Sequence, residues 1–146
     1  MAENKNEKFM KAALAEAQKA SDKQEVPVGA VVVCNDIIIA RAHNLTETLK
    51  DTTAHAEMQA ITAATSWLGG KYLTDCTIYV TLEPCAMCAG ALGWSQVSGL
   101  VYGAADEQKG FTKITGQLLH PKTQVVSGVL EKYCRDILVR FFKTKR

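Results

Sequence analysis

The sequence lacks any apolar run of the length that a membrane-spanning helix needs, roughly 18 residues. Its first residues, MAENKNEKF, are charged and lack the apolar core of a signal peptide. No repeat, low-complexity tract or linker rich in proline, glycine or serine divides the chain. Of its 146 residues, 47% are hydrophobic and 22% are charged. We therefore expect one soluble domain over residues 1–146, cytoplasmic and without a membrane partner.

Cysteine and histidine are both scarce. The five cysteines are an odd number without the spacing of a disulfide framework, and the cytoplasm would keep them reduced. Two of them, Cys85 and Cys88, stand close together, which in a cytosolic protein indicates a metal-binding or catalytic pair. Only three histidines are available to join them: His43, His55 and His120.

The net charge is small, +2 at pH 7, but basic residues gather at one end of the chain. Residues 131–146 include six basic and two acidic residues, whereas the other 130 residues carry eleven basic and thirteen acidic ones. Such a segment indicates contact with a polyanion at one place, although a solvated helix face with a basic end would have the same composition.

Hydrophobic periodicity predicts helices that alternate with strands. In order, we expect a helix over 6–20, a hairpin with its turn at Asn35-Asp36, a helix over 54–68, a strand over 76–81, a helix over 84–94, a strand over 100–103, a minor strand over 125–129 and a helix over 130–142. This order favours an α/β fold, with an antiparallel hairpin at one side of a mixed sheet. Gly29 inside the hairpin indicates the close approach of another backbone or a ligand.

Cys85 and Cys88 lie in TLEPCAMCAGA, residues 81–91, where a strand leads into a helix. Pro84 suits the first helical turn, and cysteines three residues apart share one helix face. The helix dipole favours thiolates at this end. Two thiolates at this spacing are half of a zinc site, but a packed pair of thiols or a redox CxxC motif would show the same pattern.

His55 is the best candidate for a third ligand, because it begins the helix that precedes the cysteine-bearing strand and helix. If both helices lie on the same side of the sheet, their N-termini meet at the strand ends, where α/β proteins bind ligands. His43 and His120 are flanked by loop-like sequence, and we expect them to be exposed. A three-ligand site leaves a position for water, as in catalytic zinc sites. The remaining cysteines are expected to be packed thiols: Cys34, Cys76 and Cys134.

Glu57 follows His55 by two residues, so its side chain points past the metal and not at it. A carboxylate beside a zinc-activated water can take its proton and pass it on. Taken alone, a glutamate at a helix start more often stabilises the helix dipole. Together with the three ligands, it predicts hydrolysis at a zinc centre with Glu57 as general acid and base.

His55-Ala56-Glu57 and Pro84-Cys85-Ala86-Met87-Cys88 match the H-x-E…P-C-x-x-C signature of zinc nucleobase deaminases. Over nearly its whole length the chain resembles bacterial tRNA-specific adenosine deaminases. The stretches that carry this resemblance also include Val26-Pro27-Val28-Gly29-Ala30-Val31, Asn44, Val101-Tyr102-Gly103-Ala104, His120-Pro121 and the closing Phe141-Phe142 with its basic neighbours.

The resemblance implies a cytidine-deaminase-like fold, a three-layer α/β/α sandwich with a five-stranded mixed sheet. It also implies a homodimer whose partner helps to line the active site, and one zinc ion per chain, held by His55, Cys85 and Cys88 with Glu57 moving protons. Substrate contacts are implied for Asn44, Val28, Ala56, Pro84 and Trp94. RNA contacts are implied for Phe142, Lys143, Lys145 and Arg146.

The reaction implied is hydrolysis of a C–N bond in a cyclic amidine: adenosine becomes inosine at the wobble position of a tRNA anticodon, so the anticodon arm is the expected partner. Trp94 resembles what guanine deaminases carry at this position. A deaminase of a free nucleobase, guanine or cytosine, or of a nucleoside is therefore the alternative. A structural-zinc binding module is a second alternative, which leaves Glu57 and the open coordination position unexplained.

Overall fold

The computed structural model describes residues 4–145, and every predicted helix and strand is present in it. The elements are α1 (Lys5–Asp22), β1 (Gly29–Cys34), β2 (Ile37–His43), α2 (Thr46–Leu49), α3 (Ala56–Leu68), β3 (Cys76–Leu82), α4 (Ala86–Ser95), β4 (Gly99–Ala104), the short 3₁₀ helix η1 (Phe111–Lys113), β5 (Gln124–Val126) and α5 (Glu131–Thr144). The short helices α2 and η1 were not predicted. None of the helices in the described part has the length and apolarity that a bilayer crossing requires.

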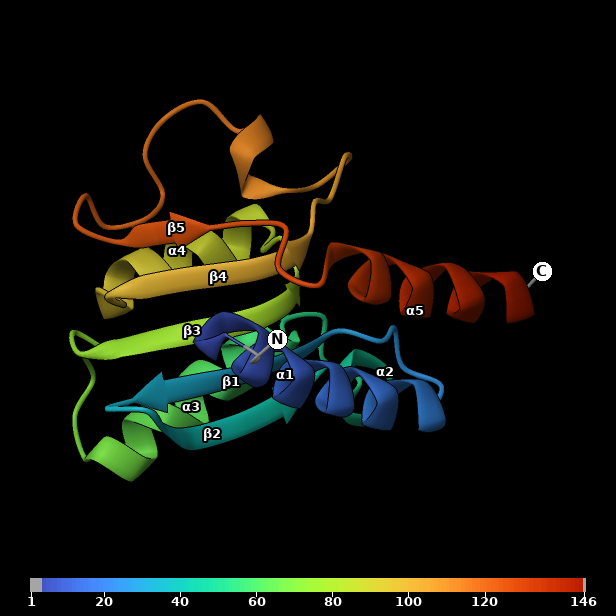
Figure 1. The fold of residues 1–146 in the computed structure, drawn as a ribbon, viewed down its shortest axis with the longest axis horizontal. Coiled ribbons are helices and arrows are strands. Elements are labelled where there is room, and N and C mark those ends of the chain that lie inside the picture. Colours follow the sequence, from blue (N-terminus) through green and yellow to red (C-terminus); the bar gives the residue numbers. More distant parts are fainter. Residues whose placement is uncertain (1–3, 146) are drawn as a thin grey trace.

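The five strands form one mixed sheet in the order β2-β1-β3-β4-β5 (Figure 1). β1 pairs antiparallel with both β2 and β3, whereas β3, β4 and β5 run parallel. The hairpin between β1 and β2 turns at Asn35 and Asp36, whose φ angles of 53° and 63° are those of a tight hairpin turn. The mixed sheet with a hairpin at one side is thereby confirmed.

Helices cover both faces of the sheet. Figure 1 shows α1 in front of the sheet and α3 and α4 behind it, and α5 packs on β4 beside α1. Each face has its own apolar core. Phe9, Met10, Val31, Tyr79 and Cys134 belong to the core under α1 and α5, and Ala60, Ala64, Ile78, Leu92 and Leu100 to the core under α3 and α4. The three-layer α/β/α sandwich is confirmed.

The close approach predicted at Gly29 is made by α1. A Cβ atom on Gly29 would lie 2.0 Å from the carbonyl oxygen of Ala13 and 2.4 Å from the nitrogen of Ala17. Both are backbone atoms of a helix and cannot move aside. The Gly29 N–H also donates to Thr81 Oγ1 at 3.1 Å, which fixes β1 against β3. A residue without a side chain is therefore required where α1 crosses β1.

The prediction that His43 is exposed is wrong. β2 extends to His43, whose side chain is only 11% exposed, and its Nδ1 lies 3.0 Å from Glu16 Oε1. Glu16 lies on α1 and its carboxylate is buried, so it requires polar partners. His43 and Lys19 supply them. His120 lies in the turn before β5, half-buried, where its Nδ1 accepts the N–H of Lys122.

Candidate active site and metal centre

Two of the three expected metal ligands are helix N-cap residues. His55 caps α3 and Cys85 caps α4, each with an extended backbone, and Cys88 lies in the first turn of α4. α4 begins shortly after β3 ends at Leu82, so its N-terminus lies at the carboxyl edge of the parallel strands. The two helix N-termini meet there, as expected for ligand sites in α/β sheets. Their dipoles favour the anionic form of the two thiols.

The three ligand atoms are spaced for a tetrahedral metal ion. His55 Nδ1 is 3.7 Å from Cys85 Sγ and 3.5 Å from Cys88 Sγ, and all three atoms lie within 4.8 Å of one another. Bonds of roughly 2.0–2.3 Å in tetrahedral zinc sites place neighbouring ligand atoms about 3.5 Å apart. Two soft thiolates and an imidazole are also the donor set that zinc prefers. These residues therefore fit zinc.

A fourth protein ligand does not join this cluster within residues 4–145. Cys34 and Cys76 lie opposite each other on β1 and β3, and Cys134 is buried in α5. All three have free thiols away from the cluster. The cluster thus offers three protein ligands, the number found in catalytic zinc sites, where water takes the fourth position.

The two sulfurs of the centre differ in protonation. Hydrogen bonds from Cys88 and His55 lower the pKa of Cys85 to about 3, so its sulfur is a thiolate at neutral pH. The Cys85 sulfur and burial together raise the pKa of Cys88 far above the ordinary thiol value. The hydrogen bond to Cys85 also raises the pKa of His55. The thiols thus share a proton that a divalent cation would displace.

Glu57, the second residue of α3, lies beside the centre without being part of the ligand cluster. Its side chain is 4% exposed, and burial raises the pKa of Glu57 to about 7. A carboxyl group that titrates near neutral pH can both accept and donate a proton under physiological conditions. The geometry and the protonation equilibrium both suit a proton shuttle.

His55, Glu57 and Cys85 open into a pocket of about 260 Å³. This volume is near the lower end of ligand pockets, roughly 300–1,000 Å³. Its walls come from two segments that are far apart in sequence. One wall is formed by Val26, Val28, Asn44 and Thr46, and the other by Leu82, Glu83, Asp106 and Lys109. The exposed surface of this pocket is mostly apolar although many of its lining residues are polar, and its size suits a single heterocyclic base.

Three of the residues expected to contact substrate, Val28, Asn44 and Ala56, line this pocket. Asn44 is buried and its amide is fixed: Nδ2 donates to the carbonyl of Val26 at 3.4 Å, and Oδ1 accepts the N–H of Thr46 at 3.3 Å. The amide therefore meets a ligand in one defined orientation, so Asn44 can discriminate between hydrogen-bond donors and acceptors on the ring.

The other two expected substrate residues are not among those that line the pocket. Pro84 adjoins Cys85, and its carbonyl accepts the N–H of Phe111 at 2.9 Å. Trp94 lies near the far end of α4 and is 86% exposed. The whole length of that helix separates it from Cys85, so Trp94 does not form a wall of the pocket in its own chain.

Asp106 and Lys109 line the pocket but were not predicted as site residues. They belong to the loop that follows β4, and the Asp106 carboxylate accepts the N–H groups of Gln108 and Lys109 at 3.1 and 3.0 Å. The sequence does contain a signal for them. A polar residue in the loop after a parallel strand lies at the carboxyl edge of the sheet, near the N-terminus of the helix that follows the neighbouring strand.

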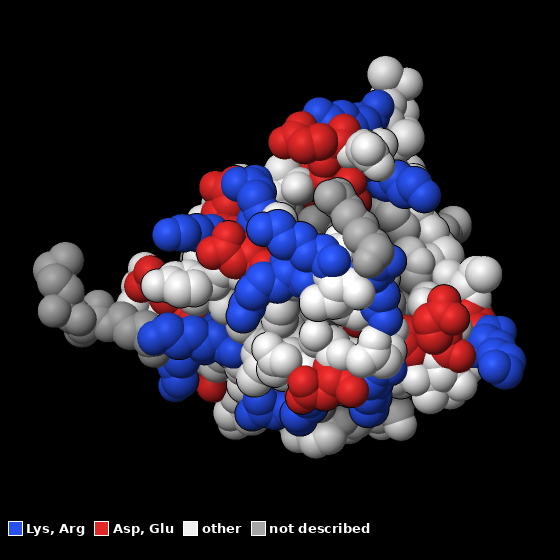
Figure 2. Space-filling model, turned by 90° about the vertical axis from the view of Figure 1, so that its right-hand side faces the viewer, with Lys and Arg blue, Asp and Glu red and all other residues white. Residues whose placement is uncertain are grey.

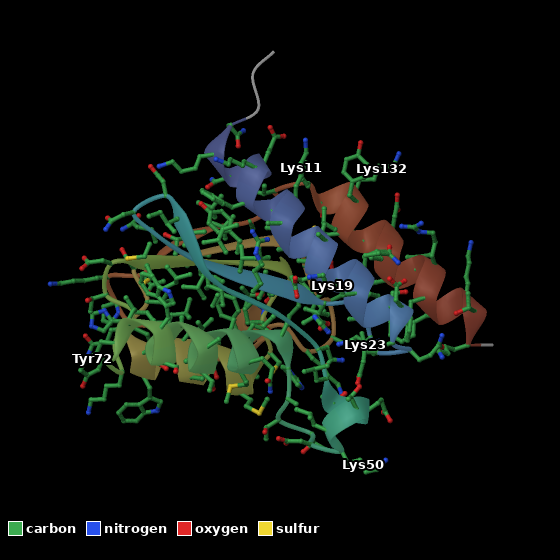
Figure 3. The ribbon with its side chains drawn as sticks, turned by 90° about the horizontal axis from the view of Figure 1, so that it is seen from below. Lys11, Lys19, Lys23, Lys50, Tyr72 and Lys132 are labelled. Atoms are coloured by element: carbon green, nitrogen blue, oxygen red, sulfur yellow. The ribbon has the colours of Figure 1, made fainter. Side chains whose placement is uncertain are left out.

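The residues expected to contact RNA lie on the last turn of α5 and just after it. Phe142 is 48% exposed, and Lys143 and Lys145 are exposed as well. Arg146 lies outside the described residues. In Figure 1 the end of α5 and the helix α2, whose Thr46 lines the pocket, lie toward the same end of the sheet, and Figure 3 shows them on opposite faces of it. The basic end of the chain and the pocket therefore lie toward the same end of the molecule.

Further lysines accompany α5 on this side. Lys145 Nζ lies over the ring of Phe141 and donates to Gln24 Oε1, in the turn after α1. Figure 3 shows Lys19 and Lys23 on the end of α1 beside α5, and Lys50 after α2. Figure 2 looks onto this side, where Lys and Arg side chains gather in the middle of the face and acidic side chains lie mainly around them. Basic side chains thus gather at this end of the molecule.

Comparison with known proteins agrees with this site. The cytidine and deoxycytidylate deaminase zinc-binding region matches residues 3–104, which include all three ligands. The chain is 49% identical to a tRNA-specific adenosine deaminase of Bacillus subtilis (strain 168), over 97% of this chain and 91% of the relative. A solved structure from a study of A-to-I editing by tRNA:A34 deaminases at the wobble position of transfer RNA has a TM-score of 0.83 and 40% identity, and covers 90% of this chain and 99% of that one. A guanine deaminase structure from Bacillus subtilis is also 40% identical, with a TM-score of 0.65, but covers only 68% of this chain and 64% of that one.

Proposed function

This chain belongs to the cytidine and deoxycytidylate deaminase family, and we propose that it is a zinc hydrolase that converts adenosine to inosine at the wobble position of a tRNA anticodon. The observation that carries the proposal is the cluster of His55, Cys85 and Cys88 with Glu57 beside it in one pocket. The full-length similarity to tRNA-specific adenosine deaminases supports an RNA substrate. A purely structural zinc module would have no use for the pocket or for a buried Glu57.

The mechanism follows from where the side chains lie. His55, Cys85 and Cys88 would hold a zinc ion, which when bound supplies a Lewis acid that lowers the pKa of a coordinated water to about 7. Glu57 accepts a proton from the attacking water and delivers it to the leaving amino group. Water adds its oxygen to C6 of adenine, the C6–N bond breaks, and ammonia leaves. Asn44, held by Val26 and Thr46, orients the ring.

An anticodon base suits this pocket because bases in unpaired loops are extruded at little cost. The pocket volume of about 260 Å³ accommodates the base, so the rest of the RNA must lie on the surface around the opening. The lysines at the end of α5 and their basic neighbours lie toward the same end of the molecule as the pocket. Phosphate contacts of this kind supply affinity without sequence specificity.

Removing residues 143–146 is expected to weaken binding of an anticodon stem-loop by about 10-fold or more in low salt, because three positive charges are lost. The slope of log K against log salt concentration should become shallower by about 2, since each phosphate contact contributes roughly 0.7–0.9. Binding measured over a series of salt concentrations tests both the loss of affinity and the change in slope. Lys71→Ala is the control, since Lys71 is exposed beside Tyr72, which Figure 3 shows at the opposite end of the molecule.

The same truncation separates the two candidate substrates. If the chain deaminates only free guanine or cytosine, and turnover of the free base survives the truncation unchanged, the proposal of an RNA substrate fails. The free-base alternative would then hold, because a base that fits entirely inside the pocket has no need of the α5 lysines.

We also propose that the chain forms a homodimer with one zinc ion per chain. Met87 and Trp94 are exposed apolar residues seven positions apart on one side of α4, the helix that Cys85 caps. A partner that covers this side would lie next to the pocket. Native mass spectrometry of the zinc-loaded protein is expected to show a dimer with two zinc ions. A monomer, or one zinc ion per dimer, would contradict this assembly.

A further inference from the structure

We infer that Glu25 and Glu83 are positioning residues, which hold the two walls of the pocket at the spacing that the substrate requires. Both are buried, with exposures of 0% and 3%, and neither takes part in the proton transfers assigned to Glu57. A buried carboxylate is costly unless hydrogen bonds compensate it. In both cases those bonds come from a loop that lines the pocket.

Glu83 holds the loop between β4 and η1. Its Oε1 accepts the N–H of Asp106 at 3.1 Å, and its Oε2 accepts the N–H and the hydroxyl of Thr112 at 3.0 and 2.8 Å. One carboxylate thus bonds both ends of the segment 106–112. Asp106 and Lys109 of this segment line the pocket, as Glu83 itself does. The position of this wall is therefore set by a side chain that immediately precedes the metal-site helix.

The loop also passes directly over the Glu83 carboxylate. A Cβ atom on Gly110 would lie 2.1 Å from Glu83 Oε2, so only glycine lets the backbone approach this closely. Gly110 forms a β-bridge with Cys85, and the Phe111 N–H donates to the Pro84 carbonyl at 2.9 Å. These contacts join the wall to the backbone around a metal ligand, so a displaced loop would change the pocket next to the reacting centre.

Glu25 holds the opposite wall with the same set of bonds. Its Oε1 accepts the N–H of Glu47 at 3.0 Å, and its Oε2 accepts the N–H and the hydroxyl of Thr48 at 2.6 and 2.7 Å. These N–H groups belong to the first turn of α2, whose own N-cap residue, Leu45, provides no side-chain bond. A carboxylate from a distant part of the sequence therefore caps this short helix.

Fixing α2 fixes the substrate-facing residues before it. Thr46 begins α2 and donates its N–H to the side chain of Asn44, and both residues line the pocket. The two glutamates thus act on opposite walls, one through α2 and Asn44, the other through the 106–112 loop. Because a binding site that is already ordered avoids the free-energy cost of ordering it when substrate binds, this rigidity bears directly on substrate binding.

The test compares Glu25→Gln and Glu83→Gln in the zinc-loaded protein. Glutamine has the size of glutamate, but its NH2 group is a hydrogen-bond donor in a place where both carboxylate oxygens accept hydrogen bonds. In Glu83→Gln, hydrogen exchange of the backbone amides of Asp106 and Thr112 should accelerate about 10-fold or more, whereas the exchange rates of Glu47 and Thr48 should stay unchanged. Glu25→Gln should show the reverse pattern. Each variant therefore serves as a control for the other.

In each variant KM for the stem-loop should rise about 10-fold, with kcat within about 3-fold of the wild type and zinc content unchanged. Glu16→Gln is a matched control, because Glu16 is a buried carboxylate whose hydrogen bonds within residues 4–145 go to the side chains of His43 and Lys19 and not to a loop of the pocket. It should leave KM and both sets of amides unchanged. Thr112→Val and Thr48→Val remove one hydroxyl bond each, and should raise KM about 2- to 3-fold if the glutamine variants fail to fold.

Two results would overturn the inference: unchanged exchange at the bonded amides, or faster exchange with an unchanged KM. A KM increase of equal size in Glu16→Gln would also overturn it, since general destabilisation would then explain the effect. The inference rests on the proposed function only for the choice of substrate. If the wild type acts on a free base and not on RNA, the proposed function fails, and KM for that base together with amide exchange still tests the two glutamates.

Discussion

Replacing Glu57 with glutamine is expected to lower kcat for deamination by about 1,000-fold or more while zinc remains bound. Glutamine fills the same buried volume next to His55 but can neither accept the proton of water nor deliver it to the leaving amino group. Because Glu57 is not part of the ligand cluster, the metal site should be intact. Single-turnover rates with inosine as the product, together with zinc analysis of the same samples, measure both effects.

Glu16→Gln is the matched control for this change, since it alters a buried glutamate of α1 that does not line the pocket. It should deaminate at a rate within about 3-fold of the wild type. If Glu57→Gln retained the wild-type rate, another group would have to move the protons, and the assignment of Glu57 would be wrong. If it lost zinc, its role would be to maintain the metal site and not to transfer protons.

Replacing Cys88 with alanine is expected to abolish both zinc binding and turnover. Cys88 is fully buried and its Sγ lies 3.5 Å from His55 Nδ1, so no other side chain or bulk water can take its place as a ligand. Zinc binds the folded state and stabilises it, so the variant should also melt at a lower temperature than the zinc-loaded wild type. Metal analysis, activity and thermal unfolding of one preparation measure the three effects together.

Cys134→Ala is the control for loss of a buried thiol. Cys134 packs in the core between α5 and β4, outside the metal cluster, so this variant should keep its zinc and its activity even if it melts earlier. A chelator should lower the melting temperature of the wild type and of Cys134→Ala, but not that of Cys88→Ala. Full activity in Cys88→Ala would contradict the assignment of the metal centre.

The parts of the fold that the sequence predicts are those with local causes. The turn at Asn35-Asp36 requires positive φ angles that these two residue types tolerate, so the hairpin is visible in a short stretch. Gly29 similarly indicates the helix that crosses over it. The proposed metal ligands are predictable for a different reason: His55 and Cys85 each cap the N-terminus of a helix, and the α/β arrangement brings helix N-termini to one edge of the sheet.

The parts that were missed depend on contacts between distant segments. α2 is too short to show a periodic pattern. The N–H groups of its first turn have no partner within the helix and are bonded by Glu25, which precedes β1. In the sequence Glu25 and Glu83 look like ordinary surface charges, and nothing local shows that both are buried. His43 was misjudged for the same reason, because its partner Glu16 comes from α1. Burial of a charge is a property of the assembled layers, so a single segment does not reveal it.

Trp94 illustrates a limit of residue-by-residue comparison. Its resemblance to the residue that guanine deaminases carry at this position suggested that Trp94 contacts the substrate. In the structure Trp94 lies near the other end of α4 from Cys85 and is 86% exposed. A large exposed apolar residue more often marks an interaction surface than a pocket in the same chain. Trp94 therefore does not line the pocket of its own chain, and we assign it to the proposed dimer surface.

The most direct test of the account is to incubate the zinc-loaded protein with an anticodon stem-loop that carries adenine at the wobble position. A matched stem-loop with that adenine moved into the paired stem, and free adenine, guanine and cytosine, are assayed in parallel for inosine and ammonia. The account predicts inosine in the first RNA and no product from the other substrates. Ammonia from free guanine or cytosine, with no inosine in the wobble RNA, would contradict it.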